Sequence, residues 1–105
     1  MTPQIEEQIR KIGERIKKEY RAEKVILFGS YATGEAGEDS DIDLFIIAPT
    51  KEPFFQRMAT VRRLIRDLRN GLPVAPIILT VKELDKRRAA EDPFIKEVLD
   101  TGIPL

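Results

Sequence analysis

Several residue types that commonly carry chemistry are absent from this chain. It contains no cysteine, so neither a disulfide bond nor a thiolate metal site can form. It also contains no histidine, which removes the most common general base and the most common zinc ligand. Any catalysis must therefore depend on carboxylates, hydroxyls, lysine, arginine and a hard metal ion.

Long apolar runs and an excess of one charge are absent as well. No apolar stretch is long enough to cross a bilayer, and the N-terminus lacks the apolar core of a signal peptide. The default expectation is thus a cytoplasmic location without membrane association. Lys and Arg together number 18, as do Asp and Glu, so the formal net charge is zero. A domain that binds nucleic acid over its whole surface is usually basic, and this composition gives no support for such a partner.

The chain has the size of one domain, and its apolar pattern predicts an α/β (α+β) organisation. Its 105 residues leave no room for a second domain, so we expect residues 1–105 to form one unit. Helical spacing predicts helices over about residues 3–20 and 54–70, and shorter helices after Thr80 and Asp92. Short β-branched runs predict strands at 25–28, 41–48 and 74–80. The expected fold is a small mixed β-sheet flanked by helices.

Two features of this sheet have alternatives. The connection between the first two strands is about a dozen residues long, which permits either a hairpin-like return or a crossover. Pro73 and Pro76 flank or interrupt the third strand. Because proline donates no ladder hydrogen bond, they indicate an edge position or a bulge.

The segment after the first strand contains a turn suited to phosphate binding. Gly29 directly follows the strand, where glycine lets the backbone approach a ligand or adopt a positive φ. Ser30 adds a hydroxyl and a nearby backbone N–H, and a helical turn after it would aim further N–H groups at the same place. Together these groups could grip a phosphate.

A pair of carboxylates opens the second predicted strand. Asp41 and Asp43 lie two residues apart, so their side chains should face the same side. Two carboxylates this close repel each other, and a divalent cation such as Mg²⁺ resolves the conflict with help from water and substrate phosphates. Either motif alone is common in loops and surface strands. The combination is what metal-assisted phosphoryl or nucleotidyl transfer requires.

In these motifs the chain resembles the nucleotidyltransferases of the DNA polymerase β superfamily, above all their minimal bacterial and archaeal members. The resemblance covers nearly the whole chain and rests on Phe28-Gly29-Ser30, Gly34-Glu35-Ala36, Ser40-Asp41-Ile42-Asp43-Leu44 and the closing segments 94–99 and 102–105. It implies that Gly29 and Ser30 hold the phosphates of a nucleoside triphosphate, ATP by first expectation. It implies that Asp41 and Asp43 are the catalytic residues and hold Mg²⁺. The implied reaction transfers a nucleoside monophosphate to a hydroxyl, and pyrophosphate leaves.

The resemblance also implies a partner protein. Minimal members of the superfamily often work beside a separate small helical protein of HEPN type, in toxin–antitoxin or two-subunit systems. Such a partner could supply the acceptor hydroxyl, for example on a tyrosine. The sequence does not decide between a monomer and a homo-oligomer.

Two departures from the family pattern bear on catalysis. The family usually has a third carboxylate on the next strand, which helps to hold the catalytic metal and activates the attacking hydroxyl. The aligned position here is Ala75, with Pro76 as the register alternative, and neither side chain can bind a metal. Thr33 stands where related sequences often carry arginine. The alternative function is a catalytically degenerate module that binds a nucleotide, or only its partner, without turnover.

A run of arginines offers a weaker third hypothesis. One predicted helix carries Arg62, Arg63, Arg66 and Arg69, which could contact phosphate or nucleic acid. The favoured interpretation is the solvated face of an amphipathic helix.

Overall fold

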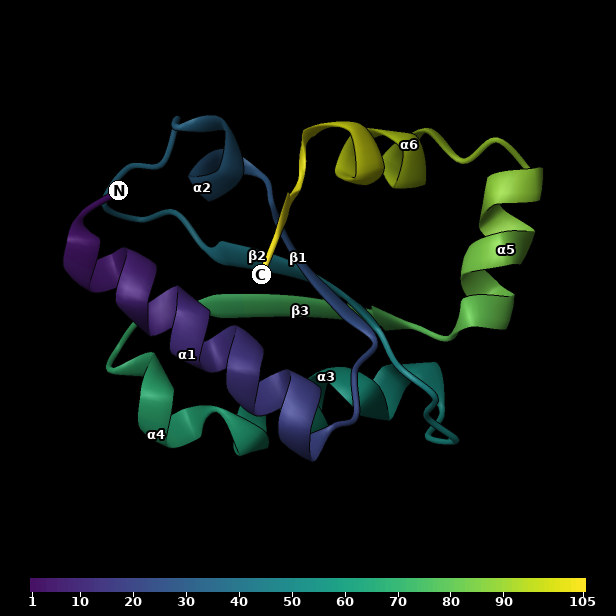
Figure 1. Cartoon of the computed structure of the whole chain (residues 1–105), viewed down its shortest axis with the longest axis horizontal. Helices are drawn as coiled ribbons and strands as arrows, with labels where there is room; N and C mark the ends of the chain where they lie inside the picture. Colours follow the sequence, from purple (N-terminus) through teal and green to yellow (C-terminus); the bar gives the residue numbers. More distant parts are fainter.

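Four strands form one mixed sheet with helices on both faces (Figure 1). In the computed structural model, which describes all of residues 1–105, the strands are β1 (Lys24–Phe28), β2 (Ile42–Ile47), β3 (Val74–Leu79) and β4 (Ile103–Pro104). Their spatial order is β3-β2-β1-β4, with β1 antiparallel to both neighbours and β2 parallel to β3. The connection from β1 to β2 is therefore the hairpin-like return, and the predicted mixed sheet is confirmed.

The helices begin close to the predicted positions. They are α1 (Pro3–Glu19), α2 (Ser30–Thr33), α3 (Phe54–Leu64), α4 (Arg66–Arg69), α5 (Val81–Ala89) and α6 (Pro93–Thr101). The Thr2 side chain caps α1 by accepting from the N–H of Ile5, and Thr80 and Glu83 form a reciprocal capping box at α5. None of these helices has the length and apolar character needed to span a membrane.

Apolar residues pack into two cores, one on each face of the sheet. Ile42 and Leu44 point into the core that α1 and α3 cover, whereas Phe45 points into the core that α6 closes with Ile95. Side chains alternate along a strand. Asp43, between Ile42 and Leu44, therefore lies on the α6 face of the sheet.

The prediction of one helix over about residues 54–70 is wrong in one respect, because the helix is interrupted at Ile65. This residue has φ −109° and ψ 8° and separates α3 from α4. Its side chain is fully buried. Arg15 of α1 donates from Nη1 to the carbonyl of Leu64 and to Asp67, each at 2.9 Å. Contacts with α1 thus override the local helical period.

The sequence predicted one edge strand of the sheet and missed the other. β3 lies at one edge, as its prolines predicted. β4 at the other edge was not predicted. Its residues Ile103 and Pro104 pair with β1, and the following Leu105 donates its N–H to the carbonyl of Val25 at 2.9 Å. A two-residue strand is too short to produce an alternating pattern.

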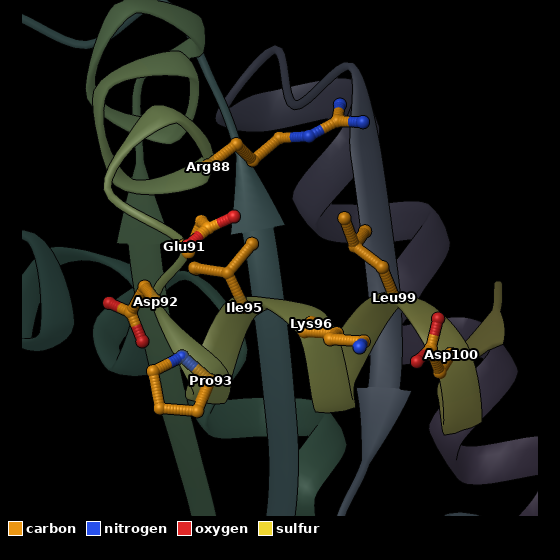
Figure 2. Close-up of a pocket in the computed structure, with 8 residues that line it drawn as sticks. All are labelled: Arg88, Glu91, Asp92, Pro93, Ile95, Lys96, Leu99 and Asp100. Atoms are coloured by element: carbon orange, nitrogen blue, oxygen red, sulfur yellow. The ribbon is translucent and has the colours of Figure 1, made fainter.

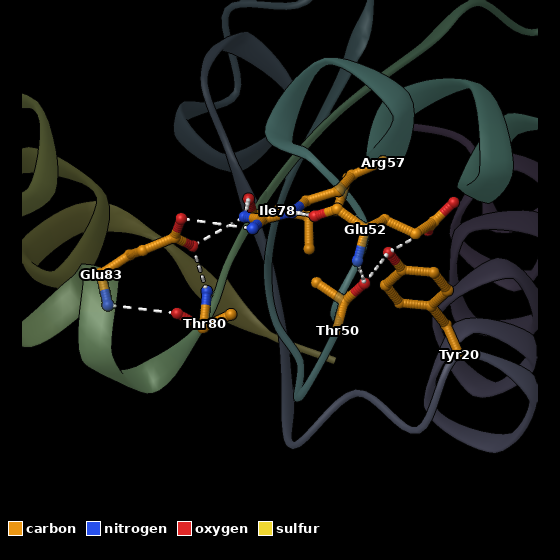
Figure 3. A network of polar contacts seen from close by, with 7 residues as sticks. All are labelled: Tyr20, Thr50, Glu52, Arg57, Ile78, Thr80 and Glu83. Carbon is orange, nitrogen blue, oxygen red and sulfur yellow. Dashed lines mark hydrogen bonds and ion pairs between the residues drawn. The ribbon is translucent and has the colours of Figure 1, made fainter.

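A buried arginine joins the β3 edge to α3 and α5 (Figure 3). Arg57 is only 6% exposed, and its Nη1 donates to the carbonyl of Ile78 at 3.0 Å. Its guanidinium also pairs with both carboxylate oxygens of Glu83, at 2.6 and 3.2 Å. Hydrogen bonding to Arg57 lowers the pKa of Glu83 from its ordinary 4.5 to about 2. The same guanidinium binds the backbone carbonyl of Glu52, whose carboxylate accepts from the hydroxyl of Tyr20 at 2.7 Å.

Candidate functional site

The predicted site residues gather where β1 ends and β2 begins. Gly29 follows β1 and Ser30 is the first residue of α2, while Asp43 is the second residue of β2. Asp41 lies one residue before β2 rather than on it, a small correction to the predicted strand. The antiparallel register pairs Asp43 with Phe28, the residue directly before Gly29. All four candidate residues therefore lie at the same end of the two central strands, β1 and β2.

Gly29 approaches Asp43 so closely that a larger residue does not fit. Its φ of 73° and ψ of −154° fall in a region that essentially only glycine occupies. A Cβ atom at this position would overlap Oδ2 of Asp43 and lie 3.2 Å from its Cγ. Both reasons for a glycine, a positive φ and a close backbone approach, apply at this position. A ligand held at the turn would lie directly beside the carboxylate.

The two aspartates differ in exposure. Asp41 is exposed, whereas Asp43 is half buried. Burial raises the pKa of the Asp43 carboxyl above its usual value, and the nearby charge of Asp41 raises it further. The ionised pair is therefore costly without a counter-charge.

The parallel register of β2 and β3 identifies the residue of β3 that lies beside Asp43. Asp43 is in register with Ala75, and Leu44 is in register with Pro76. Ala75 shares the face of Asp43, whereas Pro76 is buried on the opposite face. Ala75 is thus the residue from which a carboxylate would reach Asp43, in agreement with the position chosen from the sequence.

No other acidic residue completes a three-carboxylate site. The chain contains no group of three or more acidic or histidine side chains placed to hold a metal ion. Glu83, which is close to this strand in sequence, is paired with Arg57. Glu38 and Asp39 lie exposed in the loop before β2.

A hollow of about 240 Å³ adjoins the Gly29 turn, between the end of β1, α2 and α6. It is lined by Phe28, Gly29, Thr33, Phe94, Glu97, Val98 and Thr101. Sequence reasoning placed residues 94–99 in a closing motif and did not connect them with the turn. No sequence period signals this contact, because α6 reaches the turn only through the tertiary fold.

A larger hollow lies elsewhere. It has a volume of about 600 Å³ and lies where α5 is followed by α6 (Figure 2). Ile95 and Leu99 contribute its apolar surface, and charges of both signs surround it, including Arg88, Lys96 and Asp100. It contains none of the four predicted site residues. Size alone therefore does not mark the site in this protein.

The arginines of α3 and α4 do not line the hollow beside the Gly29 turn. Arg62 donates from Nε to the carbonyl of Val74 at 3.1 Å, so part of its donor capacity is used within the fold. Together with Phe55 and Met58 the arginines line a hollow of about 530 Å³. This surface belongs to the helices that cover the face of the sheet opposite Asp43.

Comparison with known proteins agrees with this arrangement. A family model described as a nucleotidyltransferase domain matches residues 9–103. The chain belongs to the nucleotidyltransferase domain family. The resemblance drawn from Gly29-Ser30 and Asp41-Ile42-Asp43 is thereby confirmed at the level of the family.

Several relatives of this nucleotidyltransferase domain have similar length. A candidate protein adenylyltransferase of Methanocaldococcus jannaschii is 29% identical over 100 residues, which cover 95% of this chain and 92% of that protein. The crystal structure of a candidate nucleotidyltransferase of Sulfolobus solfataricus is 33% identical with a TM-score of 0.53 and covers 82% of this chain and 81% of its own. A mutant of the toxin–antitoxin pair MntA–HpeT shares the fold at 23% identity and a TM-score of 0.54, over 95% of this chain and 70% of its own.

Proposed function

We propose that this domain transfers a nucleoside monophosphate from a nucleoside triphosphate, ATP by first expectation, to a hydroxyl group in a Mg²⁺-dependent reaction. The observation that supports this proposal is the contact between Gly29 and Asp43 in a chain of the nucleotidyltransferase family. It brings the Gly29-Ser30 turn, whose hydroxyl and N–H groups suit a phosphate, directly beside the Asp43 carboxylate.

The donor set fits one hard cation that is shared with the substrate. Asp41 and Asp43 offer carboxylate oxygens, and the raised pKa of Asp43 indicates a site that favours a counter-charge. Two carboxylates leave most of an octahedral shell to water and substrate phosphates, which is the usual arrangement for Mg²⁺. Bound there, the cation would neutralise phosphate charge as the transferred group moves.

Each residue of the turn has a distinct part in this proposal. Gly29 lets the turn approach Asp43 without a clash, and Ser30 donates its hydroxyl and backbone N–H to phosphate oxygens. The oxygen of the acceptor hydroxyl forms a bond to the α-phosphorus, the bond between the α-phosphorus and the bridging oxygen breaks, and pyrophosphate leaves. With Ala75 in place of a third carboxylate, the hydroxyl proton passes to solvent. General-base assistance of about 10²–10⁴-fold is then missing.

The acceptor that we propose is a hydroxyl on a small helical partner protein. Two comparisons support a protein acceptor. The Methanocaldococcus jannaschii relative is named as a candidate protein adenylyltransferase, and MntA occurs in a toxin–antitoxin pair with HpeT. The domain would then act as an antitoxin-like modifier of its partner.

A second candidate function is a degenerate module that binds a nucleotide or its partner without turnover. The specific observation that favours it is the register of Ala75 with Asp43, which leaves no carboxylate at the third position. The transferase and a degenerate module make opposite predictions for turnover, whether or not the module binds nucleotide.

Radioactive transfer distinguishes the two candidates. The purified protein, mixed with a candidate partner protein from a neighbouring gene, is incubated with Mg²⁺ and either α- or γ-labelled ATP. Transferase activity places the α-label, and not the γ-label, on the partner. Asp43→Asn abolishes the transfer, and the matched control Asp39→Asn, which changes an exposed acid in the loop before β2, retains it. Nucleotide binding without transfer of the α-label from any nucleoside triphosphate would support the degenerate module instead.

A further inference from the structure

The hollow beside the Gly29 turn has the size of a compartment for one ring system. Its volume is about 240 Å³, below the roughly 300–1,000 Å³ of pockets that enclose a whole drug-sized ligand. It shares Gly29 with the turn proposed to hold phosphate. A nucleotide with its phosphates at the turn can therefore extend its base into the hollow while the triphosphate stays outside.

Aromatic side chains form one wall of the hollow. The rings of Phe28 and Phe94 meet edge to face, with centroids 5.5 Å apart and an angle of 83° between their planes. Phe94 also packs edge to face on Phe45, which is fully buried. Because these contacts fix the ring positions before any ligand binds, the wall offers a preformed apolar surface for a flat base.

The polar groups of the hollow act as hydrogen-bond acceptors. Thr101 donates its hydroxyl hydrogen to the backbone carbonyl of Glu97 at 2.8 Å, which leaves the hydroxyl oxygen free to accept. Thr33 directs its hydroxyl toward the carbonyl of Gly29 in a longer contact of 3.4 Å. The carboxylate of Glu97 is an acceptor whenever it is ionised. A ligand that presents an N–H₂ group therefore matches this lining.

We propose that the hollow receives the nucleotide base and that Glu97 accepts a hydrogen bond from its exocyclic amino group. The inference rests on the proposed nucleotide binding at Gly29 and deepens it. Adenine, cytosine and guanine carry an exocyclic amino group and uracil does not. The domain thus prefers ATP, CTP and GTP to UTP, and Glu97 is a specificity-determining residue rather than a catalytic one.

Calorimetric titration in the presence of Mg²⁺ tests this inference with three ligands. ATP and UTP report on the base, and inorganic tripolyphosphate reports on the phosphate turn alone. The variant is Glu97→Ala. Its matched control is Asp100→Ala. Asp100 is on the same helix as Glu97 but lines the other hollow, shown in Figure 2. Wild type and control are expected to bind ATP about tenfold more tightly than UTP, the lower end for one hydrogen bond to a charged group.

The direction of the change separates base recognition from simple charge repulsion. Loss of a negative charge near the phosphates should leave tripolyphosphate binding unchanged or make it slightly tighter. If Glu97 binds the amino group, Glu97→Ala weakens ATP binding about tenfold and removes the preference for ATP over UTP. Unchanged or tighter ATP binding by Glu97→Ala, with tripolyphosphate still bound, would overturn this inference and leave the proposed function standing. Absence of binding of both ATP and tripolyphosphate to the wild type would overturn both.

Discussion

Replacing Ala75 by aspartate should change both stability and turnover, because this residue is in register with Asp43. Neighbouring strands lie about 4.8 Å apart, so the new carboxylate would be within about 5–6 Å of the Asp43 carboxylate. At an effective dielectric constant near 20, a pair of like charges at this distance costs about 3 kcal/mol, and water at the site reduces this figure. We expect the metal-free Ala75→Asp variant to be about 1–2 kcal/mol less stable than the wild type.

Such a loss corresponds to a fall of about 5–15 °C in Tm for a domain of this size. Addition of Mg²⁺ should recover most of it, because a cation converts the repulsion into ligation. With Mg²⁺, nucleotide and partner present, turnover should rise by about 10²–10⁴-fold as general-base assistance is restored. Thermal melting with and without Mg²⁺ measures the first effect, and transfer of an α-label measures the second.

Two further variants make this prediction refutable. The asparagine of Ala75→Asn has nearly the volume of aspartate but no charge. This variant should therefore show neither the Mg²⁺-dependent stability nor the gain in turnover. Pro76→Asp would place a carboxylate on the buried opposite face, so it should destabilise the fold without any gain in activity. An Ala75→Asp protein with the same Tm in the presence and absence of Mg²⁺, and with unchanged turnover, would contradict the assignment of this position.

Three further predictions follow from individual contacts. Gly29→Ala should cost about 1–3 kcal/mol through backbone strain and displace Asp43, so it should abolish nucleotide binding, which a binding titration measures. Gly34→Ala, also at a positive φ but with open space around it, should cost stability and retain binding. Glu83→Gln keeps a capping side chain on α5 but loses the ion pair with Arg57. It should cost about 1–2 kcal/mol in urea unfolding at pH 7, discounted for the 39% exposure of the carboxylate. Because the pKa of Glu83 is lowered to about 2, this difference should be complete above about pH 4.5 and be lost as the pH falls through about 2. A difference as large at pH 2 as at pH 7 would exclude the ion pair as its source.

The parts of the fold that the sequence predicted are those encoded by local patterns. The strand followed by Gly29, the short helical turn after Ser30, and the strand that begins beside Asp41 all depend on residues close in sequence. The prolines of the third strand also carried a local signal for an edge. The candidate site could be predicted because its two halves are adjacent along the chain and meet across one antiparallel strand pair.

The parts that escaped prediction depend on contacts between distant segments. Arg15 of α1 binds the carbonyl of Leu64 where α3 ends and α4 begins. No periodicity in residues 54–70 predicts this interruption. No local pattern distinguishes Arg57 from the other arginines of its segment, yet it is buried against Glu83. Glu97 reaches the Gly29 turn only because α6 packs on the sheet. In each case a polar group obtained its role from tertiary structure.

The most direct test of the account is Mg²⁺-dependent nucleotide binding at the two aspartates. ATP is titrated calorimetrically into the wild-type protein and into the double variant Asp41→Asn/Asp43→Asn, each with and without Mg²⁺. The account predicts saturable binding to the wild type that depends on Mg²⁺ and is lost in the double variant at millimolar ATP, with the fold retained by circular dichroism. Equal ATP binding by both proteins, or no binding by the wild type, would contradict the assignment of a nucleotide and metal site to Gly29, Ser30, Asp41 and Asp43.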